Sequence, residues 1–153
     1  MEIRLNYSAT SKENGRFLFE DEVSVRVSKQ EAFRICQNYF VYEYPSLSSE
    51  IATVLERGQR KARNKIYQER ALMRNEYELE IEYADDQSDL FTDAFIKEFF
   101  KWLLKNAYNI GCTLYNDSGL YQFVYHAKAF FFEYYSGNLR NDVIKIQKRI
   151  MRQ

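Results

Sequence analysis

The chain has 153 residues, of which 46% are hydrophobic and 29% are charged, and its formal net charge is zero. A chain of this length is typical of one domain, and a neutral chain is not expected to be a dedicated DNA-binding protein. The longest apolar stretch, residues 95–104, contains three charged side chains, which excludes a membrane span there.

Cysteine usage and the N-terminus indicate a cytoplasmic protein. Two cysteines, Cys36 and Cys112, do not make a disulfide framework, and we expect both to be buried free thiols. Free thiols are typical of a reducing compartment. The first residues also lack the basic and apolar regions of a signal peptide, so a cytoplasmic location is expected.

The N-terminal residues predict a β-hairpin and a capped helix. Apolar and polar side chains alternate in residues 2–8 and again in residues 17–27, with a polar loop between the two runs. The second run places five apolar side chains on one face: Phe17, Phe19, Val23, Val25 and Val27. Ser28 and Glu31 have the spacing of a capping box, and the helix that follows should end before Pro45.

A second, longer helix is predicted from just after Ser46 or Ser48 to about Arg74. Its apolar stripe is narrow and consists of Ile51, Leu55, Gly58, Ala62, Ile66 and Met73. Its second half is charged nearly all round and buries little beyond Ala62, Ile66 and Tyr67. A helix end of this kind is expected to project into solvent or to meet a partner.

Residues 76–83 carry the strongest strand pattern in the chain, because a glutamate alternates strictly with a large apolar or aromatic residue. Successive side chains of a strand point to opposite faces. We therefore expect one buried face, formed by Tyr77, Leu79, Ile81 and Tyr83. The other face should be exposed and carries Glu76, Glu78, Glu80 and Glu82.

The C-terminal half is predicted to be mainly helical. A helix from about 90 to 108, capped by the acidic loop 85–89, should form the core, with Phe95, Phe99 and Trp102 among the most buried residues. Residues 112–116 suggest a short strand, followed by a turn at 116–119.

Residues 120–135 fit a helical stripe, although their aromatic enrichment is also typical of a strand. A helix is favoured because Ser118 is suited to begin it and Gly137 to end it. A last helix, 138–152, has Asn138 as its cap. The sequence therefore predicts a single α+β domain over residues 1–153. In it, the hairpin and strand 76–83 form a small, mostly antiparallel sheet packed by four to five helices.

The chemistry of known catalytic and metal sites is not apparent in the sequence. His126 is the one histidine and lies in an aromatic run, where a packed structural role is favoured over a ligand or a catalytic base. The clustered glutamates suit a hard cation, but alternate glutamates more simply solvate an exposed strand face. We therefore predict no catalytic residues, no metal site and no cofactor.

Two opposed charge blocks are the best candidates for binding. Residues 57–74 hold seven bases and one acid, a local charge of +6, whereas residues 76–93 hold eight acids and no base, a local charge of −8. The candidate binding residues are Arg57, Arg60, Lys61, Arg63, Lys65, Tyr67, Glu76, Glu78, Glu80 and Glu82. The simplest alternative is that both blocks are solvated surface.

Three functions remain open at this point. The leading hypothesis is a non-catalytic interaction protein that binds a protein partner through the charge blocks and surface aromatics. Its size fits a small inhibitor or accessory protein of a bacterium, phage or mobile element. The second is a nucleic-acid-binding module in which residues 57–74 neutralise phosphates and Tyr67 stacks on a base. The third is an enzyme whose site has no familiar motif.

Overall fold

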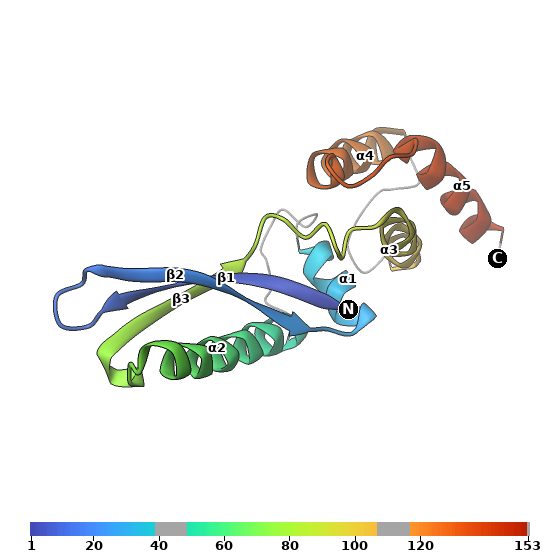
Figure 1. Ribbon diagram of the computed structural model, residues 1–153. Coiled ribbons are helices and arrows are strands. Elements are labelled where there is room, and N and C mark those ends of the chain that lie inside the picture. The colour runs from blue at the N-terminus through green and yellow to red at the C-terminus, as the bar shows by residue number, and fades with distance from the viewer. Residues whose placement is uncertain (39–48, 107–116, 153) are drawn as a thin grey trace. The chain divides into compact units, whose positions relative to one another are not determined.

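The computed structural model describes residues 1–38, 49–106 and 117–152 (Figure 1). By its internal contacts the chain divides into two compact units, each of which is described by itself. The first unit comprises Met1–Ala32 and Leu47–Gln87, and the second comprises Phe33–Ser46 and Ser88–Gln153. The predicted helix end before Pro45, the predicted strand 112–116 and Cys112 lie outside the described residues.

The first unit contains a three-stranded antiparallel sheet in the order β2-β1-β3. Its strands are β1 (Glu2–Ser11), β2 (Phe17–Arg26) and β3 (Tyr77–Tyr83). The predicted hairpin and the predicted glutamate strand are thus confirmed. The pairing shifts between Ala9 and Thr10. Phe17 therefore lies beyond this irregularity, opposite Thr10, and is 61% exposed, so its predicted place on the buried face is wrong.

Helix α2 (Ser49–Arg70) packs on one face of the sheet (Figure 1). The two lie close together at Gly58, where an added Cβ atom would overlap Cδ1 of Leu5 and would lie 3.1 Å from Cδ1 of Ile81. A larger residue at this position would therefore force the buried Leu5 side chain to shift. The core on this side is completed by Val54, Ala62 and Ile66, all nearly inaccessible to solvent.

Helix α2 ends at Arg70, four residues before the predicted end at Arg74. Ala71 adopts φ 55°, the left-handed backbone that commonly ends a helix, and a 3-10 helix, η1 (Arg74–Glu76), leads into β3. Met73 therefore lies outside the helix and is 55% exposed, contrary to its predicted place in the apolar stripe. Tyr67 is also exposed, because the stripe at the C-terminal end of α2 narrows to Ala62 and Ile66.

The capping box of helix α1 (Lys29–Gln37) is confirmed. The Ser28 backbone N–H donates to Glu31 Oε1 at 2.8 Å, and the Glu31 backbone N–H donates to Ser28 Oγ at 3.1 Å. Ala32, Ile35 and Cys36 are buried, as their helical spacing predicts.

The second unit packs aromatic side chains around helix α3 (Asp93–Lys105). Phe99 and Phe100 are inaccessible to solvent, and each makes an edge contact with Phe131 of helix α4 (Asp117–Phe131). Helix α5 (Leu139–Met151) packs against α3 and has Asn138 as its N-cap, as predicted.

Several predictions for this unit need correction. The cap of α3 is Thr92, whose side chain accepts from the Phe95 N–H, and not the loop 85–89. Trp102 is only partly buried, because it lies at the rim of the aromatic cluster with the Arg34 guanidinium 5.4 Å from its ring centroid.

Residues 120–131 are helical, which settles the ambiguity between helix and strand. However, residues 117–119 belong to α4 rather than to a turn. The helix ends at Phe131, where its apolar stripe also ends, and not at the predicted Gly137. The α+β class is confirmed, with one three-stranded antiparallel sheet and five α-helices among the described residues.

We predict that Gly58→Ala destabilises the protein although alanine favours helix. Overpacking a core typically costs about 1–3 kcal/mol, which should outweigh a propensity gain of about 1 kcal/mol. The exposed neighbour supplies the control, since Gln59→Ala should leave the free energy of unfolding nearly unchanged. Urea denaturation of both variants measures the difference, and a stabilised Gly58→Ala protein would contradict the close packing of α2 on the sheet.

We predict that Phe99→Ala costs more stability than Trp102→Ala. Truncation of a fully buried Phe typically costs about 3–5 kcal/mol, whereas the partly exposed Trp102 loses less buried area.

By the same reasoning Leu79→Ala, at a partly buried position, should cost less than truncation of a fully buried leucine such as Leu5. Chemical denaturation followed by circular dichroism ranks the variants.

Candidate functional site

The side of the sheet opposite α2 is lined by polar and acidic side chains. Leu5 and Ile81 face α2, so strand alternation places the even-numbered residues of β1 and β3, and those of β2 from Glu20 onward, on the other face. There Ser8 lies between Glu20 and Glu80. In the next row Asn6 lies between Glu22 and Glu82, and further along β3 Glu78 lies beside Thr10. We call this surface the acidic face: Asn6, Ser8, Glu20, Glu22, Glu78, Glu80 and Glu82.

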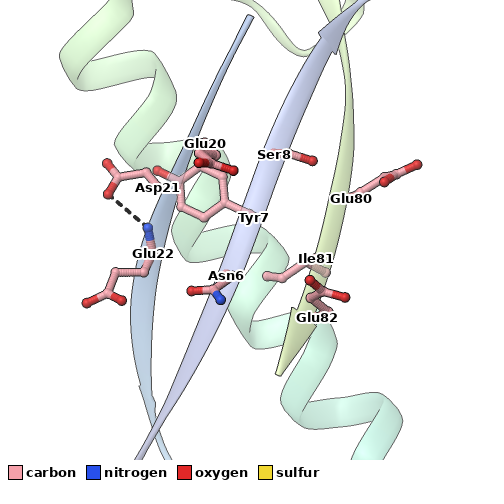
Figure 2. Close-up of a pocket in the computed structure, with 9 residues that line it drawn as sticks. All are labelled: Asn6, Tyr7, Ser8, Glu20, Asp21, Glu22, Glu80, Ile81 and Glu82. Carbon is pink, nitrogen blue, oxygen red and sulfur yellow. Dashed lines mark hydrogen bonds between the residues drawn. The ribbon is translucent and has the colours of Figure 1, made fainter. Parts of the chain in front are cut away.

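The acidic face is hollowed rather than flat. A hollow of about 760 Å³ is lined by three consecutive residues of each strand (Figure 2), namely Asn6, Tyr7, Ser8, Glu20, Asp21, Glu22, Glu80, Ile81 and Glu82. Asn6 and Ser8 of the central strand and glutamates of the two outer strands are among its lining residues. A concave surface of this kind suits a protruding basic group of another molecule.

In the described part of the chain, Arg4 is the cation that forms ion pairs on this face, and Arg26 lies farther along it, opposite Glu2. Arg4 lies 2.8 Å from Glu22 Oε2 and 3.5 Å from Asp86 Oδ2. The hydrogen bond and the charge of Glu22 raise the pKa of Arg4. Among the described residues no basic group lies within 4.0 Å of the carboxylates of Glu20, Glu80 or Glu82. The rows of glutamates therefore keep an unbalanced negative charge.

The basic residues of α2 bind the outer edge of β2. Arg57 donates to the Arg26 carbonyl at 3.0 Å, Lys61 donates to the Ser24 carbonyl, and Lys65 donates to the Glu22 carbonyl at 3.1 Å. Two of these side chains also form ion pairs, Arg57 with Glu31 at 2.6 Å and Lys65 with Asp21 at 2.9 Å. Much of the basic block thus holds the helix on its own sheet.

The remaining basic residues divide into packed and exposed ones. Arg63 lies 5.4 Å from the Tyr77 ring centroid, and Arg70 lies 3.8 Å from that of Phe19. Arg60 is exposed. The sequence predicts that the charged half of α2 projects into solvent or meets a partner. This half does not simply project into solvent, because several of its long side chains cover the edge and the rings of the sheet beside it.

The structure thus separates the candidate residues that the sequence groups together. Glu78, Glu80 and Glu82 share the acidic face, whereas Glu76 belongs to η1, where its side chain accepts from the Met73 N–H at 2.6 Å. The basic residues lie on the opposite side of the sheet. Sequence reasoning missed Glu20 and Glu22, which the observed register of the hairpin places beside Ser8 and Asn6. The irregularity after Ala9 shifts this register, so the spacing of the two runs does not reveal the pairing.

Burial of the glutamate strand is uneven. Glu78, Glu80 and Glu82 are exposed and Tyr77 is fully buried, as predicted. Leu79, Ile81 and Tyr83 are only partly buried, because β3 lies at the edge of the described sheet and its apolar side chains are covered on one flank only.

The other titratable groups offer little chemistry. No group of three or more His, Cys, Asp or Glu side chains suited to a metal ion occurs in the part of the chain that the structure describes. His126 is partly buried on α4 and makes an edge contact with Tyr125. Burial raises the pKa of the Cys36 thiol far above its usual range, so this thiol is not an activated nucleophile.

A second exposed feature is aromatic. Tyr121, Tyr125 and Phe132 are 68%, 63% and 81% exposed. Tyr121 and Tyr125 are four residues apart and so lie on one side of α4, and Phe132 directly follows the end of that helix. Large exposed aromatic side chains of this kind are enriched in protein interfaces.

Comparisons with known proteins add no assignment, because no protein-family model, curated protein or solved structure matches this chain. Among the described helices, none is both long and apolar enough to cross a membrane.

We predict that acid weakens the attachment of α2 to the sheet. The hydrogen bond from Lys65 holds the pKa of Asp21 below its usual range. Burial opposes ionisation of Glu31, but hydrogen bonds from Ser28 and Arg57 outweigh it and lower the pKa of Glu31. Carboxylates with a lowered folded-state pKa contribute stability above their unfolded pKa of about 4, and that stability is lost as the pH falls further.

Urea midpoints measured between neutral pH and about pH 3 check this prediction. The double variant Asp21→Asn, Glu31→Gln should be less stable at neutral pH and should lose less stability on acidification than the wild type. An identical pH dependence in both proteins would show that these two carboxylates do not anchor α2.

Proposed function

We propose that this chain is a non-catalytic interaction protein whose acidic face binds a basic surface of a protein partner. The observation that carries the proposal is the pair of cross-strand rows Glu20-Ser8-Glu80 and Glu22-Asn6-Glu82, which surround a hollow and are neutralised only at Arg4 among the described residues. A concave acidic surface attracts cations and accelerates association with a basic partner.

A protein partner is favoured over nucleic acid by the positions of the two charge blocks. The acidic face would repel a phosphate backbone, and Arg57, Lys61 and Lys65 are engaged with the sheet of their own chain. Binding phosphates with these side chains would require them to leave the β2 edge. A small inhibitor or accessory protein of a bacterium, phage or mobile element remains the biological role that we propose.

The exposed aromatics supply a second expected contact region. Tyr121, Tyr125 and Phe132 would provide rigid apolar anchors, which carry much of the binding energy in many interfaces. Charge on the acidic face would then govern the rate and specificity of association, and aromatic burial would govern the lifetime of the complex.

We predict that charge reversal on the acidic face abolishes capture of the partner. The bait is the full-length chain, applied to lysate of the native host with and without nuclease. At low salt the wild type should retain a protein partner whose capture survives nuclease treatment. The double variant Glu80→Lys, Glu82→Lys should fail to retain that protein. The matched control is Glu13→Lys with Glu56→Lys, which makes the same charge change at exposed positions outside the acidic face and away from the exposed aromatics. Equal retention by both double variants would rule out the acidic face.

We predict that nucleic acid binds the chain negligibly. A gel-shift titration with a random oligonucleotide tests this for the wild type and for Arg60→Glu with Arg74→Glu. These two residues are exposed, so their reversal should leave the fold intact, whereas Lys61 and Arg63 contact the sheet. Tight, salt-sensitive binding that the double variant loses would instead support the nucleic-acid hypothesis.

A further inference from the structure

The two edges of the described sheet differ in how their backbone groups are covered. In an antiparallel ladder the N–H and C=O of one residue point to the same side, and the side alternates from residue to residue. The Val27 N–H donates to the Met1 carbonyl, so odd-numbered residues of β2 face β1 and even-numbered ones face outward. The outward carbonyls of Glu22, Ser24 and Arg26 are those bound by the three basic side chains of α2.

In β3 the odd-numbered residues, rather than the even-numbered ones, have their backbone groups on the outer edge. The Ala84 N–H donates to the Arg4 carbonyl at 3.0 Å, and the Lys12 N–H donates to the Glu76 carbonyl at 3.2 Å, so even-numbered residues of this segment face β1. The backbone groups of Leu79 and Ile81 therefore point away from the sheet. In the described ranges β1 is the one strand beside β3. An open edge is a template on which another strand can pair.

The side chains that flank this edge specify what would pair with it. On the α2 side, Leu79 and Ile81 are only partly buried, so an added strand would cover apolar surface there. On the other side, Glu78, Glu80 and Glu82 are exposed and would stand beside every second residue of the added strand. The complementary segment alternates apolar residues with lysine or arginine.

We propose that the outer edge of β3 receives an extended segment of the partner as a fourth strand, with basic and apolar residues in alternation. This inference rests on the proposed function and names the binding mode. Backbone hydrogen bonds supply affinity in this mode, and the alternating side chains supply specificity. A second copy of the chain is a poor occupant, because pairing two β3 edges in antiparallel fashion would bring glutamates of both copies together on one face.

The test uses the full chain and a capped peptide of seven residues that alternates lysine with valine. Amide hydrogen exchange is followed by NMR in the presence and absence of the peptide. In the free protein, the amides of Leu79 and Ile81 should exchange faster than those of Glu80 and Glu82, which bond β1. The peptide should slow exchange at Leu79 and Ile81 and leave the neighbouring amides nearly unchanged. Slow exchange at Leu79 and Ile81 in the free monomer would mean that the edge is already closed, and would overturn the inference.

Two control peptides separate strand pairing from simple charge attraction. One has the same composition with its lysines and valines in separate blocks, and the other is N-methylated at alternate residues on the edge that would face β3. Both should bind at least about tenfold more weakly than the alternating peptide. Equal affinity of all three peptides would show that the acidic face attracts cations without adding a strand.

A variant on the protein side tests the same point. Leu79→Pro removes an outward N–H without removing a ladder hydrogen bond, and such edge positions tolerate proline. Leu79→Ala is the matched control, because it truncates the side chain and keeps the N–H. We expect Leu79→Pro to lose peptide binding and edge protection while Leu79→Ala retains both.

The two proposals fail in different ways. If Glu80→Lys with Glu82→Lys abolishes capture of the partner but Leu79→Pro does not, the edge inference is wrong and the proposed function stands. If the alternating peptide protects the edge but the acidic-face variant captures the same proteins as the wild type, the proposed function fails instead. Dimerisation of the free chain through β3, seen by light scattering and lost in Leu79→Pro, would overturn the inference in favour of a second copy.

Discussion

The first unit depends on a match between two lengths, the rise of four residues of helix α2 and the rise of two residues along strand β2. Four residues of helix rise about 6 Å and two residues of an antiparallel strand rise about 6.8 Å. Basic residues four apart, Arg57, Lys61 and Lys65, can therefore reach successive outward carbonyls two apart, those of Arg26, Ser24 and Glu22. Gly58 brings the helix close enough for this contact. Arg57 and Lys65 combine this carbonyl contact with an ion pair, to Glu31 and Asp21 respectively.

This contact gives the sheet two different edges and two different faces. The helix covers one face and its basic side chains cover the β2 edge, where the long alkyl stems of lysine allow the charge to reach past the sheet. The acidic face and the β3 edge are left without an equivalent partner from the described chain. A chain with no net charge thereby carries a strongly negative face, and three of its basic side chains, Arg57, Lys61 and Lys65, attach α2 to the edge of the sheet instead.

The second unit is built on a different principle. Its core consists of aromatic rings at tilted and edge geometries, such as Phe91 against Phe131 and Phe100 against Phe123. Such pairs stabilise by area and by ring electrostatics, and they need no charged attachment. The rings that find no partner inside, Tyr121 and Tyr125, lie on the outer side of α4. Each unit thus presents a distinct kind of surface, acidic and concave in the first and aromatic in the second.

The sequence by itself determined the elements whose signals are local. Strand alternation set the two faces of residues 77–83, and the caps Ser28 and Asn138 set two helix starts, because these effects act between residues close in the chain. Only the tertiary structure decided which charges remain available. Lys61 and Arg60 look alike in the sequence, yet one bonds a carbonyl 37 positions away and the other is exposed. Likewise, the acidic face joins Glu20 and Glu80 through Ser8, and that pairing depends on register between distant segments, which residue spacing alone does not encode.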